Sequence, residues 1–253
     1  MKPVNKTDQE PMRVAKAIAR SGLCSRRDAE KWIEQGRVKL NNSVLTTPAY
    51  VLKSGDELKV DDKVLPQMAE LQVWCYHKPR GLVTTHKDPE GRPTVFQTLD
   101  ASLPRVVSVG RLDINTEGLL LLTTRGDFAR HLELPSSKWI RKYRVRAKGR
   151  ITQDKLGELG RGITVDGIKY GAISAEFERQ QGANCWLNVS LKEGKNREIK
   201  KVLSFLGLEV NRLIRVSYGP FSLGNLEVGR LTEVKKRVLR SFLGEKLFKN
   251  FQS

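Results

Sequence analysis

The sequence has few of the residues that bind metals or form disulfides. Its 253 residues include three cysteines and three histidines. The cysteines are far apart and form no CxxC pair, and the histidines lack the spacing of metal ligands. Neither a zinc site nor a redox-active pair is therefore predicted. Phosphate-binding loops of the GxxxxGKS or GxxxxGKT type and the GxSxG nucleophile motif are also missing. Metal, nucleotide and thiol chemistry are disfavoured, and carboxylate chemistry remains.

Long hydrophobic runs are absent as well. No run approaches the roughly 20 apolar residues with which a helix crosses a membrane. The first residues, MKPVNKTDQEPM, contain no apolar segment of the secretory type. We therefore expect a cytoplasmic protein without membrane contacts. Hydrophobic residues make up 39% of the chain, which is enough for a folded core.

Acidic residues are scarce relative to basic ones. The 28 aspartates and glutamates face 46 lysines and arginines, which gives a net charge of +18. Such an excess predicts a polyanionic partner, with nucleic acid first and an anionic membrane surface second. The membrane interpretation is the weaker one, because no strongly amphipathic segment supports it. Because molecules that carry the same large positive charge repel one another, we expect a monomer.

Residues 12–65 are predicted to form a compact unit of two short helices followed by small strands, after a disordered segment over residues 1–11. Ser25 with Asp28 three residues later is typical of a helix start. Asn41-Asn42 is typical of a hairpin turn. The density of cations in this unit favours phosphate contacts over an ordinary solvated surface. The candidate RNA-binding residues are Arg13, Lys16, Arg26, Arg27, Lys31 and Arg37.

The segment SGLCSRRDAEKWIEQGRVKLNN of this unit resembles the S4 domain, an RNA-binding module of ribosomal proteins, some tRNA synthetases and RNA-modifying enzymes. The resemblance implies RNA binding and says nothing of chemistry. A short polar linker, about Asp61 to Glu70, follows. The rest of the chain is divided into a larger domain over residues 71–232 and a basic C-terminal extension over residues 233–253. We interpret the extension as a weak helix or an RNA-contacting segment.

The larger domain combines strand and helix patterns. Helices are predicted at Phe128–Leu134 with Asp127 as its N-cap, at Gln153–Leu159, and after Gly194. Strands are predicted at Val73–His77, Leu82–Thr85, Val106–Val109, Leu119–Thr123, Lys142–Arg146, Ile163–Val165, Ile173–Phe177, Trp186–Leu191 and Val210–Val216. In the last of these strands, Arg212 and Arg215 are predicted to face outward.

The stretch from Val106 to Asp127 organises this domain. Two short apolar runs bracket a polar loop that contains Arg111 and Asp113, and a polar loop between buried strands is how a scaffold presents a reactive group. Taken alone, Asp113 is more simply a turn residue that caps its own backbone. The alternative is a carboxylate that reacts with a substrate. Tyr143, among four cations, is either an ordinary strand aromatic or a surface on which a base stacks.

Taken together, the segments after residue 70 resemble the RsuA-like family of bacterial ribosomal RNA pseudouridine synthases, and are closest to its RluB branch. The motifs that carry the resemblance are KPRG (78–81), DPEGRPTVF (88–96), GRLDINTEGLLLLTTRGD (110–127), KYRV (142–145), EGKNREIKKV (193–202) and RLIRVSYGPFSLG (212–224). The GRLD motif is highly specific, and an S4-like unit before it strengthens the resemblance. It implies an α+β fold in which a small helix–helix–strand domain precedes a mixed, largely antiparallel sheet flanked by helices, with the active site in a basic cleft.

The resemblance reverses the interpretation of Asp113, which matches the essential aspartate of the family. Tyr143 matches the active-site tyrosine that packs on the target base. Lys200 occupies a position where many relatives have an arginine paired with the aspartate, and a lysine there is a point charge rather than a bidentate partner. The further substrate contacts that we expect are Arg111, Leu213, Lys78, Arg92 and Arg197.

The implied reaction cuts the C1′–N1 bond of a uridine, turns the uracil and joins C5 to C1′. Nothing is oxidised, reduced or hydrolysed, so no cofactor is expected. The uridine must leave its stack, at a cost of a few kcal/mol that binding supplies. We expect the substrate to be large-subunit ribosomal RNA, with small-subunit RNA as the alternative. The competing interpretation is an inactive S4-containing ribosome assembly factor, against which the intact Asp113, Tyr143 and Lys200 argue.

Overall fold

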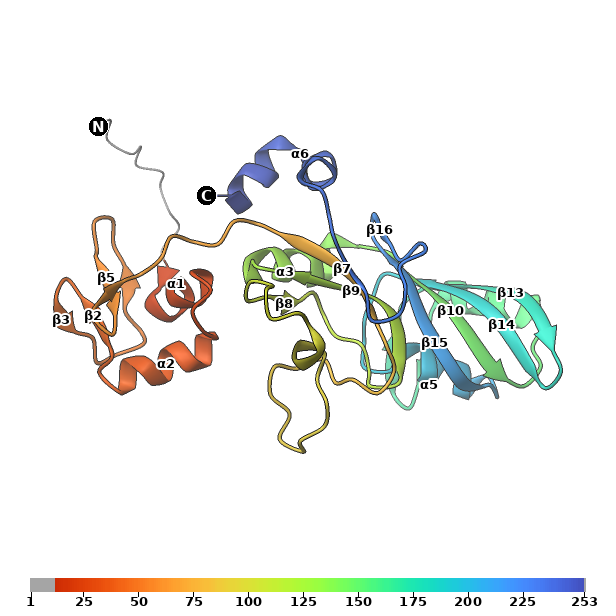
Figure 1. Ribbon diagram of the computed structural model, residues 1–253. Coiled ribbons are helices and arrows are strands. Elements are labelled where there is room, and N and C mark those ends of the chain that lie inside the picture. The colour runs from red at the N-terminus through yellow and green to blue at the C-terminus, as the bar shows by residue number, and fades with distance from the viewer. Residues whose placement is uncertain (1–11, 253) are drawn as a thin grey trace.

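The computed structural model describes residues 12–252, and two units are visible in it (Figure 1). The disorder predicted for residues 1–11 lies outside the described residues. A small N-terminal unit lies beside one end of a larger domain, and a long C-terminal helix crosses above that domain. Within the described range, no helix is both long and apolar enough to cross a membrane.

The small unit contains the two helices and small strands that were predicted. Its elements are β1 (Met12–Arg13), α1 (Val14–Arg20), α2 (Arg26–Glu34), β2 (Val38–Leu40), β3 (Ser43–Val44), β4 (Val51–Leu52), β5 (Leu58–Val60) and β6 (Lys63–Val64). The hydroxyl of Ser25 accepts a hydrogen bond from the Asp28 amide at 3.1 Å and so caps α2. Asn41 and Asn42 both have positive φ, as the tight β2–β3 hairpin requires. Ile18 and Ile33 pack with Val38 in a core of their own.

The linker begins later than predicted. Asp61 and Asp62 have φ angles of 49° and 63° and form a second tight hairpin turn. The residues after it form β6, and Leu65 packs partly buried against the small core. The prediction of a linker from residue 61 was wrong, because two aspartates in the left-handed region act here as the two asparagines do at the first hairpin.

The larger domain is built on one mixed sheet, and the expected α+β fold is confirmed. Its strands are β7 (Val73–Lys78), β8 (Val107–Ser108), β9 (Thr116–Thr123), β10 (Arg141–Lys148), β13 (Ile173–Gln181), β14 (Asn184–Leu191), β15 (Glu209–Tyr218), β16 (Phe221–Ser222) and β17 (Leu231–Glu233). The main order is β13-β14-β10-β15-β9-β7-β17, with β16 beside β15 and β8 beside β9. Within residues 12–252 the pairs of this sheet are antiparallel except for β9 and β15, which run parallel.

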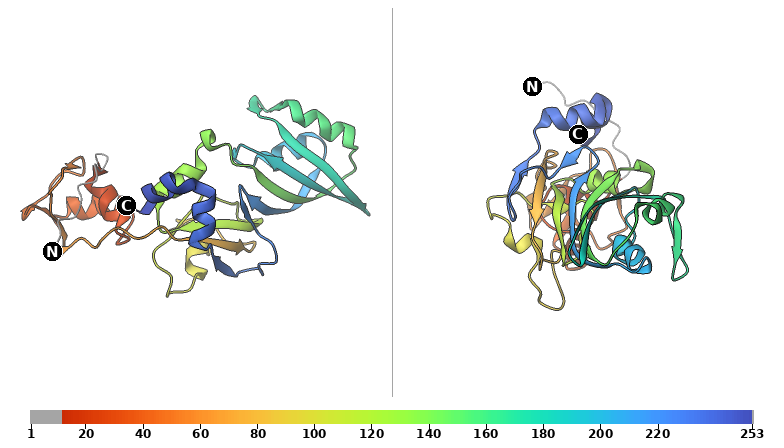
Figure 2. Two further views of the ribbon diagram at one scale, coloured as in Figure 1. Left: turned by 90° about the horizontal axis from the view of Figure 1, so that it is seen from above. Right: turned by 90° about the vertical axis from the view of Figure 1, so that its right-hand side faces the viewer.

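Helices cover both faces of the sheet, and a separate hairpin lies beside it. These elements are η1 (Val95–Thr98), α3 (Gly126–Glu133), η2 (Pro135–Ser137), α4 (Gln153–Gly157), η3 (Glu158–Arg161), β11 (Ile163–Val165), β12 (Ile168–Tyr170), α5 (Glu198–Phe205) and α6 (Lys236–Gln252). Leu156 of α4 and Ile199 of α5 belong to one hydrophobic core, whereas Phe128 of α3 and Phe248 of α6 belong to the other. The right-hand view of Figure 2 shows α6 and α5 on opposite sides of the sheet.

Strand β9 explains why an unbroken leucine run belongs in a sheet. All eight of its residues are buried. Leu120 and Leu122 point into the core beneath α4 and α5, and Leu119 and Leu121 point into the core beneath α3 and α6. Since neighbouring side chains on a strand alternate between faces, a strand covered on both faces needs apolar residues at every position.

Gly118 permits the close approach of the two parallel strands. It has a φ of 100°, and a Cβ at this position would lie 2.3 Å from the carbonyl oxygen of Arg215. A strand residue with a side chain would therefore push β9 and β15 apart. The glycine within the leucine-rich motif is a packing requirement of the sheet.

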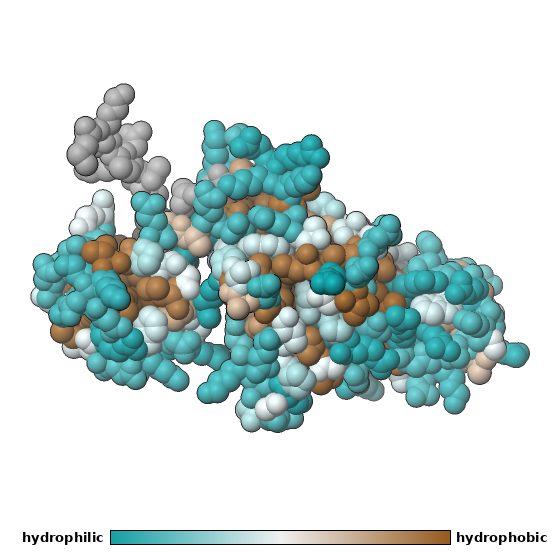
Figure 3. Space-filling model, in the orientation of Figure 1, coloured by the Kyte–Doolittle hydropathy of each residue, from teal (hydrophilic) through white to brown (hydrophobic). Residues whose placement is uncertain are grey.

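The basic C-terminal segment is part of the fold. Strand β17 pairs with β7 at the edge of the sheet, so the sheet continues past residue 232. Helix α6 bends at Gly244, which has a φ of 74°, and buries Leu239 and Phe248. Figure 3 shows hydrophilic residues on the outer side of α6 and hydrophobic residues gathered beneath it. The boundary predicted at residue 233 is therefore not a structural one.

Three local predictions were wrong. Residues 82–85 form one isolated bridge, between Val83 and Thr94, instead of a strand. Asp127 lies inside the first turn of α3, whose N-cap is Arg125. Arg215 is buried and donates from Nε to the carbonyl oxygen of Leu119 at 2.7 Å. It cannot share an exposed face with Arg212, because residues three apart on a strand point to opposite faces.

The two units meet at an ion cluster. Asp127 accepts two hydrogen bonds from the fully buried Arg125, at 3.1 and 2.9 Å. Arg20, at the end of α1, reaches the same carboxylate from the small unit at 3.0 Å. Burial alone would raise the pKa of Asp127, but Arg125 and Arg20 together lower it below its usual value. The carboxylate is thus held ionised between one arginine of each unit.

Candidate active site

The Asp113 loop is a short turn that leads directly into β9. The Thr116 amide donates to the carbonyl oxygen of Asp113 at 2.9 Å and closes the turn. The Asp113 side chain remains 35% exposed. Leu112 before it is buried, and its carbonyl oxygen accepts a hydrogen bond from the Thr84 hydroxyl at 2.9 Å. The loop is fixed on both sides of a carboxylate that is open to solvent.

Lys78 holds this loop from beneath. It is fully buried, and its ammonium group donates to the carbonyl oxygens of Pro79, Ile114 and Thr116 at 2.9, 3.3 and 3.0 Å. Burial lowers the pKa of Lys78 to about 8, while the carboxylate of Asp113 acts in the opposite direction. All three of its donors are used by backbone carbonyl oxygens, which leaves none for the direct substrate contact expected from the sequence.

The sheet register brings Tyr143 and Leu213 to the same place. Leu213 of β15 is paired with Thr116 of β9 on one side and with Val145 of β10 on the other. Tyr143 lies two residues before Val145, so its side chain shares the face of Leu213. Both side chains are buried in the core that also contains Leu112. A mostly buried aromatic and an apolar side chain thus lie where the Asp113 loop enters the sheet.

Lys200 reaches Asp113 from helix α5. The helix packs Ile199, Val202 and Leu203 onto the same sheet face. Lys200 is 19% exposed, and its amine lies 3.5 Å from the Asp113 carboxylate. The pairing expected from the sequence is present as a single contact to one oxygen. A partly exposed carboxylate, a cation and an aromatic side chain are therefore brought together from three separate segments.

The turn before α5 is held by Glu198, a residue that sequence reasoning missed. Its carboxylate accepts a hydrogen bond from the Lys195 amide at 2.9 Å, and burial raises the pKa of Glu198. Arg197 is the N-cap of the helix and has a left-handed backbone, with φ 52° and ψ 29°. The turn fixes the start of the helix that carries Lys200. The EGKNRE motif contains this signal, since an acidic residue three positions after a turn commonly bonds back to it.

The other predicted substrate residues differ in how available their side chains are to bind a phosphate. Arg111 and Arg197 are exposed, as a phosphate ligand needs to be. Arg92 is held within its own loop by hydrogen bonds to Asp88 at 3.0 and 2.8 Å and by an ion pair with Glu90 at 2.9 Å. Its guanidinium is therefore less available for phosphate than the sequence suggested.

The predicted RNA contacts of the small unit also differ in availability. The exposed ones are Arg13, Arg26, Arg27 and Lys31, and Lys16 is partly buried. Arg37 is engaged within the unit, because it makes two hydrogen bonds to Asp61 and lies 4.6 Å above the ring of Trp32. Arg37 stabilises the unit in this conformation, and the first turn of α2 carries two of the exposed cations, Arg26 and Arg27.

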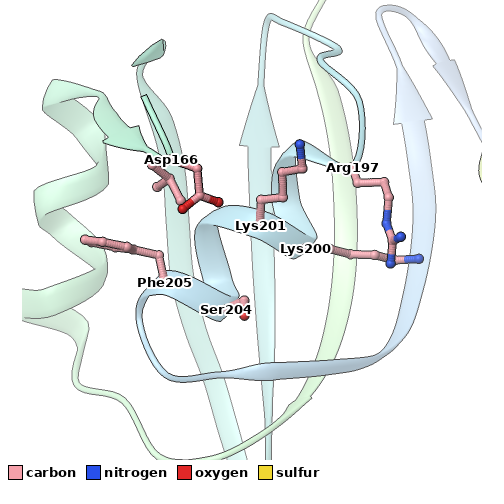
Figure 4. Close-up of a pocket in the computed structure, with 7 residues that line it drawn as sticks. Asp166, Arg197, Lys200, Lys201, Ser204 and Phe205 are labelled. Carbon is pink, nitrogen blue, oxygen red and sulfur yellow. The ribbon is translucent and has the colours of Figure 1, made fainter. Parts of the chain in front are cut away.

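A cavity of about 400 Å³ lies beside Lys200, and Figure 4 shows its lining. Its walls are formed by Val165, Asp166, Arg197, Lys200, Lys201, Ser204 and Phe205. Phe205 was not among the site residues predicted from the sequence. The signal available in the sequence was an aromatic residue at the end of a helix whose apolar positions recur at helical spacing.

Comparisons with known proteins identify the family of this chain. Residues 72–205 match the RNA pseudouridylate synthase family, and residues 12–58 match the S4 domain. An uncharacterized RNA pseudouridine synthase of Rickettsia conorii is 44% identical over 90% of this chain and 99% of its own length. Ribosomal large subunit pseudouridine synthase B of Salmonella typhi is 39% identical over 83% of this chain and 75% of its own length.

Structural similarity points the same way. A crystal structure described as a pseudouridylate synthase has a TM-score of 0.63 and 27% identity, and the match covers 90% of this chain and 98% of that one. The chain belongs to the RNA pseudouridylate synthase family, whose members are isomerases. The family predicted from the sequence motifs is confirmed, and the S4 resemblance of the N-terminal unit is confirmed with it.

Proposed function

We propose that this chain converts one uridine of large-subunit ribosomal RNA to pseudouridine, with Asp113 as the catalytic carboxylate. The observation that carries the proposal is the Asp113–Lys200 pair, 3.5 Å apart, at the point where Tyr143 and Leu213 share one sheet face. The ribosomal substrate is supported by similarity to the Salmonella enzyme, whose name specifies the large ribosomal subunit. The excess of cations supports an RNA substrate in general.

Each group has a role that its position supports. The flipped uracil lies against Tyr143, which offsets part of the cost of unstacking the base. The carboxylate of Asp113 attacks or deprotonates the ribose, or stabilises positive charge at C1′, while the C1′–N1 bond breaks and the C5–C1′ bond forms. C5 then loses its proton and N1 gains one, so the reaction is a net isomerisation. Lys200 orients the carboxylate through its ammonium group, which lies 3.5 Å away. Lys78 keeps the loop backbone in place from below.

The exposed cations of the small unit are assigned to RNA binding. Arg26 and Arg27 lie in the first turn of α2 and are exposed. No ion pair is recorded for either within residues 12–252. Both guanidinium groups are therefore available for phosphates. In this division of labour the small unit holds the RNA and the larger domain performs the isomerisation.

The test is pseudouridine mapping of ribosomal RNA by carbodiimide modification and primer extension. Cells that lack the protein are compared with cells that carry it unchanged, with Asp113→Asn or with Asp154→Asn. Asp154 is an exposed carboxylate on α4 and serves as the matched control. We expect one site to be lost in the deletion, restored by the unchanged protein and by the control, and absent with Asp113→Asn. In single turnover, Asp113→Asn is expected to lower the rate by on the order of 10⁴-fold.

Two results would contradict the proposal. If the deletion changes no uridine in large-subunit RNA, the substrate is wrong, and a change in small-subunit RNA would identify the alternative. If Asp113→Asn supports modification as well as Asp154→Asn does, the catalytic assignment is wrong. A protein that binds RNA and rescues ribosome assembly without modifying any uridine would be the inactive assembly factor.

A further inference from the structure

The isomerisation leaves the cavity beside Lys200 without a role. We propose that it binds a second, unpaired nucleotide of the RNA substrate, adjacent to the target uridine. Its base stacks on Phe205, and its phosphate is held by Lys201 and Arg197. The inference rests on the proposed function, because it requires the RNA strand to reach Asp113.

Phe205 is the first observation. Helix α5 buries Ile199, Val202 and Leu203, yet its last residue, Phe205, leaves 60% of its surface exposed. Phe205 also lines the cavity, so its exposed ring is open to a ligand that enters there. An aromatic face bordered by cations is the arrangement with which proteins bind single-stranded nucleic acid, because every base can stack on it.

The charges of the cavity are the second observation. Arg197, Lys200 and Lys201 face one acidic residue, Asp166. In Figure 4, Phe205 and Asp166 lie on one side, the tips of Arg197 and Lys200 lie on the other, and Lys201 is between them. A phosphate is attracted to the cationic side and repelled by Asp166. The base is left on the Phe205 side, where the carboxylate can accept a hydrogen bond from a base N–H group.

The position of the cavity is the third observation. Lys200 lines it and also lies 3.5 Å from the Asp113 carboxylate. The two sites thus share a wall, and a nucleotide in the cavity is a neighbour of the uridine at Asp113. A volume of about 400 Å³ falls within the usual range of small-ligand sites. Arg197 has a left-handed backbone, a conformation that is unfavourable for arginine and is often retained at binding sites.

The stacking half of the proposal is tested with purified protein and ribosomal RNA from cells that lack it. Single-turnover rates are measured against enzyme concentration for Phe205→Ala, Phe205→Leu and Phe205→Trp. Phe177→Ala, at a partly exposed phenylalanine of β13, is the control. Because stacking of one base is lost, Phe205→Ala and Phe205→Leu should raise the half-saturating concentration roughly tenfold. Phe205→Trp should restore it, and the plateau rate should change far less.

The phosphate half is tested by salt dependence. Lys201→Gln should reduce the slope of log affinity against log salt by about 0.7, as expected for one phosphate contact on a single strand. Phe205→Ala should leave this slope unchanged. Lys155→Gln, which removes an exposed lysine of α4, is the charge-matched control.

The outcomes separate this inference from the proposed function. Fluorescence quenching of the Phe205→Trp protein by a short single-stranded RNA reports stacking whether or not any uridine is modified. Modification with a normal half-saturating concentration in Phe205→Ala would overturn the nucleotide site and leave the enzyme assignment intact. Equal behaviour of leucine and phenylalanine would show an apolar contact without stacking and would also overturn it. A defect confined to cells, with normal kinetics on purified RNA, would assign Phe205 to a protein partner.

Discussion

Gly118 sets the spacing of the strands that hold the active site. β9 follows the Asp113 loop, and β15 carries Leu213, so the parallel contact between them positions both residues. Any Cβ at residue 118 would lie far inside the contact distance of the Arg215 backbone. The backbone at residue 118 also has a positive φ, which disfavours every residue with a side chain.

We therefore expect Gly118→Ala to be strongly destabilising. The steric overlap and the unfavourable φ together should lower the free energy of unfolding by about 3 kcal/mol or more. Chemical denaturation would measure the loss. Gly160→Ala is the control, since a Cβ there meets nothing within 4 Å and its φ is not positive. A Gly118→Ala protein as stable as this control would show that the strands can separate without cost.

Lys78 should impose a pH dependence on the reaction. Its pKa of about 8 means that it loses its proton in the folded protein well below the usual range. A neutral amine has two N–H donors for three carbonyl oxygens, so the Asp113 loop should loosen and the single-turnover rate should fall above about pH 8. The single-turnover rate of Lys200→Arg should show the same decline with pH. Lys78→Met should have a low rate at every pH and show no such decline. A decline of the same shape in Lys78→Met would assign the titration to another group.

The stability effect of Lys78 has the opposite sign. Since its pKa is lower in the folded than in the unfolded chain, the unfolded chain binds more protons between pH 8 and the usual lysine value. Stability from this group therefore rises with pH across that interval, and its cost is complete below pH 8. Relative to Lys78→Met, the unchanged protein should gain about 3 kcal/mol at most over the interval. Opposite trends in rate and stability would separate loop positioning from unfolding.

At the scale of elements, local patterns predicted most of the helices and strands that surround the site. The alternation of apolar and polar residues predicted β10, and the unbroken apolar run predicted β9. The turn residues Asn41-Asn42 predicted the first hairpin. The failures depended on tertiary contacts. Arg215 is buried because its guanidinium satisfies a backbone carbonyl of the neighbouring strand, and no local pattern contains that information.

The candidate site shows the same limit. Asp113, Tyr143 and Lys200 were predicted as site residues from the resemblance of their motifs. That they lie close together depends on the register of β9, β15 and β10, which the sequence does not reveal. The burial of Lys78 was not predicted, because a lysine in a turn is normally solvated, whereas this one is covered on all sides. Phe205 was missed because its exposure depends on what α5 packs against.

Helix α6 should contribute to stability through its buried face. Phe248 is buried, stacks under the Arg240 guanidinium, and shares a core with Phe128 and Leu119. Phe248→Ala should lower the free energy of unfolding by about 3–5 kcal/mol, as expected for a buried phenylalanine. Val238→Ala, on an exposed position of the same helix, should cost much less. Equal stability of the two variants, measured by thermal unfolding, would show that α6 is a detachable extension.

At the scale of the whole molecule, Arg20 fixes the small unit against the larger domain. Arg20→Gln removes this ion pair between the units and leaves the Arg125–Asp127 pair intact. The loss of a partly buried charged hydrogen bond of about 2 kcal/mol should raise the population of separated units roughly 30-fold. Limited proteolysis of residues 66–70 would report this separation. Arg26→Gln, which removes an exposed charge from the same unit, should be cleaved like the unchanged protein.

The pairing of β17 with β7 has a consequence for the order in which the protein is made. β7 is the first strand of the sheet in the larger domain, and it pairs with β17, which is translated almost at the end of that domain. The small unit needs only residues 12–65 for its own core and is therefore complete much earlier. We therefore expect each newly made chain to pass through a stage in which the S4 unit is folded and the sheet of the larger domain is still incomplete.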